Sequence, residues 1–374
     1  MTIHCIVGGQ FGSEAKGHVA AQLAHQYRNR EARTVLVRVG GSNAGHSAVD
    51  DNGVVWALRQ IPAAAVVDRE AKLVIAQGSE ISVDVLLSEI DALDDAGFDV
   101  SSRLYIDPSA TIVEQQHVDL ETGSDLNARV GSTAKGIGAA RADRIMRKAT
   151  TAINNSDVSK WCLNTARFIA SEHYRATPSN IIVEGTQGYG LGMHTGFYPQ
   201  STSGDCRNVD LLAQIGFIPL DPSRPRDIHT WIVYRTYPIR VAGNSGALFN
   251  ELTWEQLSAR TDGYIQPERT TVTKKIRRIG EWDAKLAAQA IVANGGANDH
   301  MHPCLMFTDY LAPQLHKETQ YNRLYSALNF DQTHEIRRRA ADIGSPFAMY
   351  GTGQATAIID HEMLEYQINN WKGN

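Results

Sequence analysis

The sequence predicts an α/β fold with a mostly parallel central sheet flanked by helices, and three observations support this prediction. Short apolar runs rich in β-branched residues alternate along the chain with helical patterns, as in βαβ units. The runs end in small, polar, glycine-containing segments that suit tight turns. The chain has 374 residues, 43% of them hydrophobic, which is enough to bury a large core. We therefore expect one domain over residues 1–374, with excursions from it.

Each apolar run has the length and composition of a buried strand. In chain order the expected strands are HCIVGG (4–9), TVLVRVGG (34–41), LVIAQG (73–78), RLYI (103–106), NIIVEG (180–185), WIVYRT (231–236), CLMFTD (304–309) and FAMYG (347–351). Two longer segments, 14–27 and 82–97, repeat apolar residues at helical spacing and predict helices.

Six loops follow these strands and are the first indication of a functional site. They are GQFGSEAKG (9–17), GSNAGH (41–46), GTQGYG (185–190), YPIRVAGNSG (237–246), TDYL (308–311) and GTGQ (351–354). The carboxyl ends of parallel strands form the ligand crevice of an open sheet. We therefore expect these loops to converge on one site, the alternative being that they are ordinary turns.

The overall composition restricts the class of ligand. A formal net charge of −5 gives no global basic field, so we expect a small phosphorylated substrate and no direct contact with nucleic acid. The four cysteines form no CxxC pair, which favours a reduced, cytoplasmic protein. No export signal precedes the first strand, and no apolar run is long enough for a membrane span, so no membrane partner is expected.

The first loop, GGQFGSEAKGH at residues 8–18, has features of a phosphate-binding loop. Glycines precede the first predicted helix, where free backbone N–H groups and the helix dipole attract phosphate. Lys16 adds a positive charge for the terminal phosphates. Gly17 follows where a standard Walker loop has a serine or threonine for magnesium, so the predicted site is P-loop-like and not a standard P-loop.

A second loop, GGSNAGHS at residues 40–47, places Asn43 and His46 at another strand end. A histidine there can donate to a phosphoryl oxygen or act as an acid. With both loops present, the chain resembles the adenylosuccinate synthetase family, whose GDEGKGK loop reads GSEAKGH here and whose NAGH is intact. The resemblance implies a C–N ligase that couples NTP hydrolysis to joining L-aspartate to C6 of a 6-oxopurine nucleotide, through a 6-phosphoryl intermediate.

The resemblance extends nearly end to end. GSTAKGIGAARADRIMRKA (131–149) looks like the family's nucleoside-monophosphate segment, and EGTQGYGLGMHTGFYPQSTS (184–203) is similar to its EGAQG…GTYP…TSS stretch. It also implies a homodimer in which Arg147 reaches into the neighbouring subunit's site. The implied monophosphate-binding residues are Ser13, Asn43, Ser132, Thr133, Arg147, Gln187, Thr202, Val241 and Lys275.

TVTKKIRRIGEWD, residues 271–283, looks like the family's aspartate-binding loop. Cations beside small hydroxyls suit a dicarboxylate, and Arg277 can grip a carboxylate bidentately, although a solvated basic helix face would have the same composition. The resemblance implies aspartate contacts from Thr271, Val272, Thr273 and Arg277. Lys275 replaces an arginine that faces ribose and aspartate in the family, so we expect altered sugar selection.

Ser13 stands where the family has an aspartate that takes the purine N1 proton and helps to hold magnesium. A serine alkoxide is not available at neutral pH without strong activation. Three explanations are open: an inactive protein, an IMP-dependent enzyme with a shifted base, or a changed substrate. We favour the third, because serine leaves space for the 2-amino group of guanine and its oxygen can accept a hydrogen bond from it.

The same departure resembles the bacteriophage branch of the family, the 2-aminoadenylosuccinate synthetases. These enzymes convert dGMP and L-aspartate to N6-succino-2-amino-2′-deoxyadenylate for diaminopurine-containing DNA. We expect this reaction, in a host cytoplasm, with ordinary adenylosuccinate synthesis from IMP and GTP as the alternative. The expected catalytic residues are Ser13, Glu14, Lys16 and His46, and the N1 base stays open among Glu14, His46, a metal-bound water and the transferring phosphate.

The base-recognition residues also depart from the family. Its TKLD appears as MFTD, with Phe307 and Asp309, and its STGP appears as GTGQ. Phe307 can stack on any purine and Gln354 can hydrogen-bond the edge of adenine, so we expect ATP or dATP in place of GTP. The expected NTP-binding residues are Gly12, Ala15, Lys16, Gly17, His46, Phe307, Asp309, Gly351, Thr352, Gly353 and Gln354. Phosphoryl transfer implies Mg²⁺, placed at Ser13 and the Gly45 carbonyl.

Two functions of another class are weaker. A nucleotide-binding switch would need neither the segment from Thr133 to Arg147 nor the cationic loop around Arg277. A Rossmann dehydrogenase would need a GxGxxG that the first loop lacks. Aspartate-dependent formation of a succinylated product distinguishes the ligase from both.

Overall fold

The computed structural model describes residues 1–28, 30, 32–172, 175, 177, 179–217, 227–270 and 274–360. Within these residues a 9-stranded central sheet has the order β16-β15-β14-β10-β1-β9-β2-β5-β7. The strands are β1 (Thr2–Gly8), β2 (Arg33–Arg38), β5 (Lys72–Ile75), β7 (Leu104–Ile106), β9 (Ser179–Glu184), β10 (Asp227–Arg235), β14 (Met301–Met306), β15 (Met349–Gly351) and β16 (Ala357–Ile359). All neighbours pair in parallel except β15 and β16, which confirms the predicted α/β class.

The eight expected strands are the eight parallel ones, because burial on both faces gives each a continuous apolar run. All six residues of β9, for example, are buried. The antiparallel edge strand β16 was not expected. It has three residues, too few for a periodic pattern, and its pairing with β15 identifies it.

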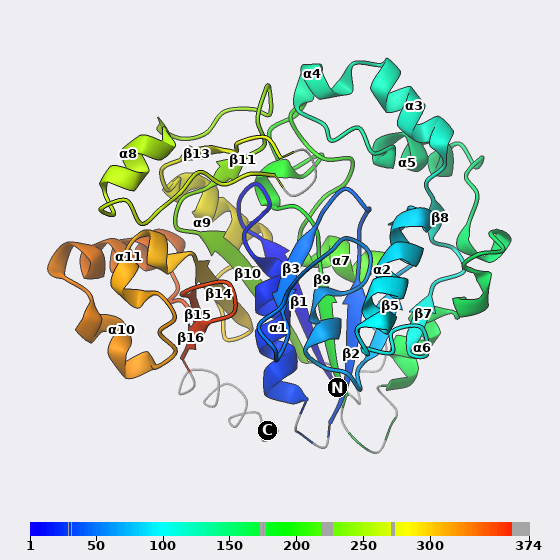
Figure 1. The fold of residues 1–374 in the computed structure, drawn as a ribbon, viewed down its shortest axis with the longest axis horizontal. Coiled ribbons are helices and arrows are strands. Elements are labelled where there is room, and N and C mark those ends of the chain that lie inside the picture. The colour runs from blue at the N-terminus through cyan, green and yellow to red at the C-terminus, as the bar shows by residue number, and fades with distance from the viewer. Residues whose placement is uncertain are drawn as a thin grey trace.

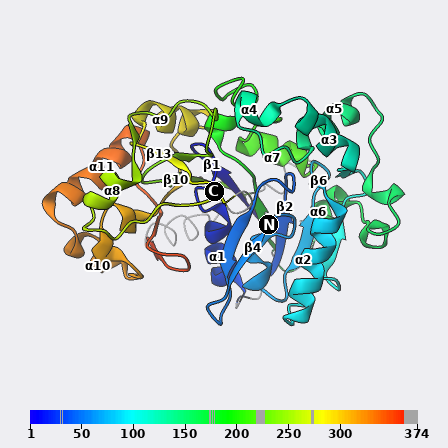
Figure 2. The same ribbon diagram turned by 45° about the horizontal axis from the view of Figure 1, so that its top comes forward.

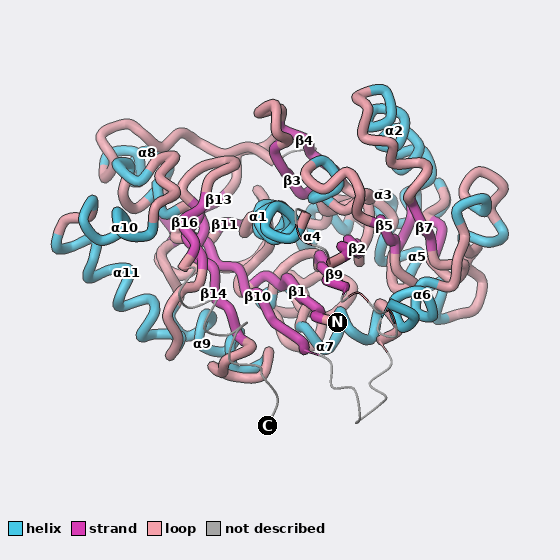
Figure 3. Tube along the Cα trace, turned by 90° about the horizontal axis from the view of Figure 1, so that it is seen from below, coloured by secondary structure: helices cyan, strands magenta, loops and turns pink. Residues whose placement is uncertain are grey.

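Helices cover both faces of the sheet (Figure 3). One core cluster packs α1 and α2 on one face, and a second packs α6, α7, α9 and α11 on the other. The helices are α1 (Lys16–Tyr27), α2 (Val83–Asp95), α3 (Gln115–Gly123), α4 (Leu126–Val130), α5 (Ile137–Ile145), α6 (Thr165–Glu172), α7 (Asn208–Gln214), α8 (Trp254–Ala259), α9 (Ala284–Ala293), α10 (Tyr321–Ala327) and α11 (Phe330–Ile343). None of the described helices has the length and apolarity needed to cross a membrane.

The first predicted helix, 14–27, begins two residues later than expected. Glu14 and Ala15 remain in the loop because Ser13 and Ala15 have positive φ, at 57° and 72°, and so cannot continue a right-handed helix. The loop therefore extends to the residue before Lys16. This brings Glu14 under the loop, as described below.

Two excursions rise beyond the carboxyl ends of the central strands (Figures 1 and 2). One contains α3, α4 and α5. The other contains a small antiparallel sheet in the order β11-β13-β12 together with α8, and has its own apolar core. The remaining strands are β3 (His46–Val49), β4 (Val55–Leu58), β6 (Glu80–Ile81), β8 (Thr111–Ile112), β11 (Ile239–Arg240), β12 (Glu251–Leu252) and β13 (Arg278–Gly280). Between the excursions lies the cavity that positions the site.

Candidate active site

A cavity of about 430 Å³ opens where β1, β2, β9 and β10 end. Four of the six predicted loops line it, together with the α4–α5 segment and the segment before β13. The expected site residues that line it are Ser13, Asn43, Gly45, His46, Ser132, Thr133, Gln187, Thr202, Val241, Lys275 and Arg277. The fold thus brings most of the expected monophosphate and aspartate residues to one place.

The other two loops do not line this cavity. They are linked to the first loop through Arg235, which covers the Phe307 ring and donates to the Ser13 carbonyl. Thr308 Oγ1 donates to the Gly351 carbonyl at 2.6 Å, and the two loops lie side by side after β14 and β15. The sheet order explains the separation, because β14 and β15 lie on one side of β10 while β9 and β2 lie on the other side of β1. The first loop, after the central β1, lies between the two groups.

Within the first loop, Glu14 and Lys16 form a fully buried ion pair. Glu14 Oε2 lies 2.6 Å from Lys16 Nζ, and Oε1 accepts from the backbone N–H groups of Gln10 at 3.2 Å and Gly12 at 2.7 Å. The carboxylate therefore holds the loop together and neutralises the lysine. The Glu14 carboxylate thus occupies the position beside the Lys16 ammonium that a terminal phosphate would take.

Ser13 projects from the loop and is exposed. Its Oγ accepts a hydrogen bond from Arg277 Nη1 at 2.8 Å, and its carbonyl accepts from Arg235 Nη1 at 3.0 Å. The oxygen expected to meet a guanine amino group thus already has a cationic donor, while its own proton is still available to donate. Ser13 thereby connects the first loop to the predicted aspartate segment.

His46, at the start of β3, is held by two buried charges. Its Nδ1 contacts Glu184 Oε1 and lies 2.8 Å from Arg38 Nη1. Glu184 also accepts from the backbone N–H of Ala63 at 2.8 Å. Burial, aided by Arg38 and opposed by Glu184, lowers the pKa of His46 to about 4, so its imidazole is neutral at neutral pH. Burial would raise the pKa of Glu184, but Arg38 and His46 hold it below its ordinary value.

Glu184 and Arg38 were missed by the sequence analysis, although a signal existed. Each is a charged residue at the end of an apolar run, IIVE and TVLVR. The parallel register pairs Arg38 with Glu184 on neighbouring strands, at a separation of 3.1 Å between Nη1 and Oε1. Opposite charges at the ends of two apolar strands predict such a buried pair once the strands are known to be adjacent.

No carboxylate replaces the family's missing aspartate in the described part of the cavity. Among the described lining residues, Glu121 is the single acidic one. Its oxygens accept from the backbone N–H groups of Gly136 at 2.8 Å and Gly138 at 2.7 Å, so it holds the monophosphate segment in shape. Glu14, an expected base, lies inside the loop and does not line the cavity.

The cavity also contains residues that carried no expectation. Arg240 lies over the Phe11 ring, with 4.0 Å between its Cζ and the ring centroid, and donates to the Ser245 carbonyl. All three residues line the cavity beside Val241. Cation–π contacts of this kind hold an aromatic face in a fixed position.

The predicted base-recognition residues have partners of their own. Arg235 Cζ lies 3.7 Å from the centroid of Phe307, covering one face of the ring, and the guanidinium pairs with Glu268. Asp309 Oδ2 accepts from the Tyr264 hydroxyl at 2.7 Å and lies 3.3 Å from His316 Nδ1. These partners were not foreseen, because Tyr264 and His316 come from distant loops.

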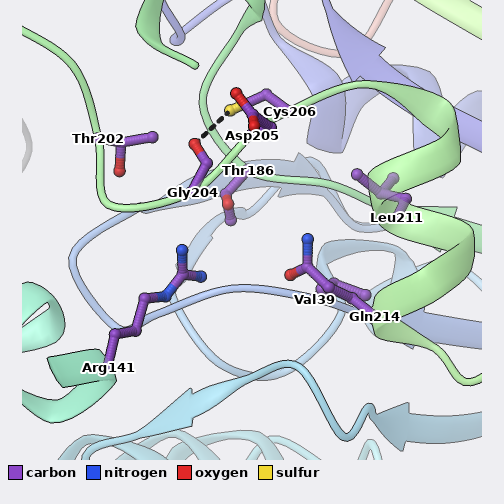
Figure 4. Close-up of a pocket in the computed structure, with 9 residues that line it drawn as sticks. All are labelled: Val39, Arg141, Thr186, Thr202, Gly204, Asp205, Cys206, Leu211 and Gln214. Carbon is purple, nitrogen blue, oxygen red and sulfur yellow. Dashed lines mark hydrogen bonds between the residues drawn. The ribbon is translucent and has the colours of Figure 1, made fainter. Parts of the chain in front are cut away.

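A smaller pocket shares Thr202 with the cavity. Figure 4 shows the Arg141 side chain pointing into it, toward Gly204 and Thr186. A Cβ on residue 204 would collide with Arg141 Nη1, so a larger residue there would oblige the end of the arginine side chain to shift. Arg141 Nε also donates to Glu80 Oε1 at 2.6 Å, which ties α5 to β6.

The remaining expected residues lie elsewhere. Arg147 is exposed just after α5 and does not line the cavity of its own chain. Its neighbours Ile145 and Met146 are 73% and 61% exposed. The aspartate contacts assigned to Thr271, Val272 and Thr273 lie outside the described residues.

The chain is similar to known proteins in sequence and in structure. The adenylosuccinate synthetase family profile matches residues 5–161 and 153–312. The adenylosuccinate synthetase of Pyrococcus horikoshii is 34% identical over 292 residues, 78% of this chain and 80% of the relative. That of Thermococcus sibiricus is 31% identical over 365 residues, 96% and 98% of the two chains.

Two solved structures share the fold. The cyanophage S-2L succinoaminodeoxyadenylate synthetase, bound to dGMP and to dATP as an energy donor, has a TM-score of 0.74 at 27% identity and covers 99% of both chains. The fully ligated adenylosuccinate synthetase of Plasmodium falciparum has a TM-score of 0.76 at 17% identity, with 96% of this chain and 99% of that chain covered. The second likeness concerns the fold alone.

Proposed function

The chain belongs to the adenylosuccinate synthetase family and is a C–N ligase, and from that premise we propose that its substrate is dGMP. The reaction joins L-aspartate to C6 with NTP hydrolysis and gives N6-succino-2-amino-2′-deoxyadenylate. The γ-phosphoryl group moves to O6, and the aspartate amine then displaces it as phosphate. We further propose that this product supplies diaminopurine DNA and that the enzyme acts in the cytoplasm of a phage host.

The observation that carries the proposal is Ser13 together with a cavity wall in which the single acidic residue among the described ones, Glu121, is engaged by backbone N–H groups. A carboxylate at position 13 would occupy the space beside N1, whereas serine leaves that space for the 2-amino group of guanine. The S-2L relative, at 27% identity over 99% of both chains, was solved with dGMP bound, which supports the same substrate here.

The residues divide the reaction between them. Ser132, Thr133 and Gln187 line the cavity and are assigned to the monophosphate, and Arg277 and Lys275 line it as well and offer cations to the aspartate carboxylates. Arg277 is half-buried and its guanidinium can leave Ser13 for an aspartate carboxylate in a bidentate contact. Binding of aspartate would then free the Ser13 oxygen for the purine.

His46 is the residue best placed to contact the transferring phosphoryl group. His46 lines the cavity, and Glu184 and Arg38 fix the orientation of its ring. Nδ1 of the neutral ring donates to the Glu184 carboxylate, which leaves Nε2 as an acceptor, so a hydrogen bond from Nε2 to a phosphoryl oxygen requires the ring to take up a proton when the phosphate binds. Glu184 therefore acts as a positioning residue for His46.

Mg²⁺ fits the site only in part. Gly45 lines the cavity, and a Cβ there would meet nothing nearer than Arg59 Cγ at 3.8 Å, so its backbone is open to a ligand. Ser13 fits poorly as a ligand in this state, because its oxygen already accepts from the Arg277 cation. When bound, Mg²⁺ neutralises charge on the β and γ phosphate oxygens. Of the two expected positions, we retain Gly45.

We propose ATP or dATP as the phosphoryl donor. Asp309, the residue that remains of the family's guanine-recognition pair, already accepts from Tyr264, and Phe307 replaces the lysine. A guanine edge would have to displace this hydroxyl, whereas Phe307 offers stacking to either purine. The S-2L relative contains dATP as its energy donor, which supports an adenine nucleotide.

The test is product formation by the purified protein with Mg²⁺, measured by mass spectrometry. Each of dGMP, GMP, dIMP and IMP is combined with ATP, dATP or GTP, and every mixture is run with and without L-aspartate. We expect an aspartate-dependent succinylated product from dGMP with ATP or dATP, and little from IMP. Product from IMP with GTP alone would establish the ordinary reaction that the curated relatives are named for.

A further inference from the structure

A cluster of histidines and one aspartate lies at the amino ends of the central strands β10 and β14, whereas the cavity lies at the carboxyl ends of the strands. Asp227 is the first residue of β10, His229 follows on the same strand, and His300 immediately precedes β14. Asp227 Oδ2 lies 2.7 Å from His229 Nε2, and Asp227 Oδ1 lies 3.1 Å from His300 Nδ1. One ligand atom from each of the three residues lies within 4.8 Å of the others.

Strand geometry explains why these side chains meet. Residues two apart on a strand project from the same face, which places Asp227 and His229 together. The parallel register pairs Thr230 with Met301, so that His300 lies beside His229, with 5.1 Å between the ring centroids. The nine residues of β10 span roughly 25 Å at about 3.3 Å per residue. This length separates the cluster, at the amino end of the strand, from the cavity at its carboxyl end, so the cluster is independent of the substrate site.

A second layer of buried rings supports the first. His229 Nδ1 lies 2.6 Å from His302 Nε2, and the His302 ring stacks on Trp231 at 4.5 Å between centroids. Trp231 Nε1 in turn donates to His4 Nδ1 at 3.1 Å. Histidines that bind metals are usually fixed in this way, through a hydrogen bond at the nitrogen that does not face the ion.

The protein alone leaves part of this cluster unsatisfied. Among the described residues, His302 Nδ1 is a buried atom without a hydrogen-bond partner, and Asp227 Oδ1 is another, although its ion-pair contact with His300 Nδ1 is 3.1 Å long.

We propose that Asp227, His229 and His300 form a binding site for a divalent transition-metal ion, with Zn²⁺ as the best match. One carboxylate and two imidazoles are ligands that Zn²⁺ prefers, whereas Mg²⁺ prefers oxygen, so this site differs from that of the catalytic ion. Ligand atoms around tetrahedral Zn²⁺ lie about 3.4 Å apart, and one ligand atom from each of these three residues lies within 4.8 Å of the others, so small side-chain movements would bring them to an ion. His300 is 51% exposed in its side chain, which leaves an entry path and a fourth position for water.

The ion would link the starts of β10 and β14 and stabilise the sheet from this edge. The ligands come from two neighbouring strands, so binding favours the folded chain over the unfolded one. The stabilisation requires no change at the catalytic cavity. A metal-free and a metal-loaded enzyme should therefore differ in thermal stability before they differ in substrate affinity.

The experiment uses the full chain, stripped with EDTA and dialysed, and then titrated with Zn²⁺ in excess Mg²⁺. Equilibrium dialysis gives stoichiometry and affinity, visible absorption of the Co²⁺-loaded protein reports the ligand set, and thermal unfolding reports stabilisation. The variants are His300→Ala and Asp227→Asn, with the exposed His334→Ala as the control for losing any surface histidine. Circular dichroism of the metal-free proteins checks that each variant is folded.

We expect one Zn²⁺ per wild-type chain, and a loss of affinity of at least about tenfold in His300→Ala and Asp227→Asn but not in His334→Ala. A Zn²⁺-dependent rise in melting temperature should be present in the wild type and the control, and smaller or absent in the two ligand variants. No stoichiometric binding by the wild type would overturn the proposal. Equal binding by His300→Ala and the wild type would do so as well.

Discussion

At the scale of single residues, the hydroxyl of Ser13 is engaged by the same arginine that we expect to bind aspartate. The 2.8 Å hydrogen bond from Arg277 joins the purine side of the cavity to the aspartate side. Burial lowers the pKa of Arg277 and Glu268 opposes the effect, but the guanidinium remains charged at neutral pH. A charge introduced at position 13 would therefore alter both halves of the site.

We predict that Ser13→Asp lowers kcat/KM for dGMP by at least about tenfold, equivalent to roughly 1.4 kcal/mol. The new carboxylate would fill the space beside N1 and form an ion pair with Arg277. Ser13→Ala is the matched control, because it removes the hydrogen bond without filling space, and should cost less. Steady-state kinetics with dGMP and with IMP measure both variants, and unchanged dGMP kinetics in Ser13→Asp would rule out the steric explanation.

At the scale of elements, the first loop is stabilised from inside. Two of its non-glycine residues, Ser13 and Ala15, have positive φ, a conformation that costs free energy unless the surroundings enforce it. Glu14 supplies that enforcement through two backbone hydrogen bonds and the ion pair with Lys16. The loop is thus held in shape before any nucleotide binds.

We predict that Glu14→Gln lowers the free energy of unfolding by about 3–5 kcal/mol, because it leaves the buried Lys16 ammonium without its charge partner. Asp51→Asn is the control. It breaks the Arg28–Asp51 pair, in which Asp51 is 58% exposed, and should cost less than about 1 kcal/mol. Urea unfolding followed by circular dichroism compares the two, and equal losses would show that Glu14 does not brace the loop.

Helix α1 carries a buried histidine, His18, whose pKa burial lowers to about 4 from 6.5. Between these two pH values, His18 is protonated in the unfolded chain and neutral in the folded chain. Stability should therefore fall as pH falls from about 6.5 toward 4, and be unaffected by this group above pH 7. We predict that His18→Gln reduces this pH dependence by about one proton, measured as urea midpoints across the range. A slope that does not change would contradict the assignment.

At the scale of the whole molecule, Arg147 does not line the cavity of its own chain. It is exposed at the end of α5 beside two exposed apolar residues, a composition that fits a contact with another chain. We infer from this a homodimer in which the arginine completes the partner's site. The inference extends the family resemblance, and mixing of variants tests it.

We predict that Arg147→Ala and Arg277→Ala are each nearly inactive alone, and that subunit exchange between them restores about a quarter of the wild-type rate. Half of randomly exchanged dimers are mixed, and each mixed dimer has one intact site. Sedimentation or light scattering must show dimers in the same solution. If mixing restores no activity although dimers exchange, Arg147 does not act across the interface.

Most of the parallel sheet could be predicted because each of its strands is a local apolar run. The site could be predicted in part, because the resemblance identified Asn43, Gln187 and Thr202 from short motifs, and the structure places all three in one cavity. Their roles in binding remain predictions. Residues with no motif of their own, such as Tyr264 beside Asp309, could not be found, because nothing local in the sequence indicates the contact.

The sequence by itself determined the α/β class, the family, and the replacement of an acid by Ser13. These depend on residue identity and on spacing within short segments. Only the tertiary structure decided that the six loops form two groups, that Glu14 is buried under its own loop, that Arg277 engages Ser13, and that Asp227 meets two histidines from neighbouring positions in the sheet. The physical reason is strand order and register: contacts between distant segments depend on which strands are neighbours, and local periodicity carries no information about that.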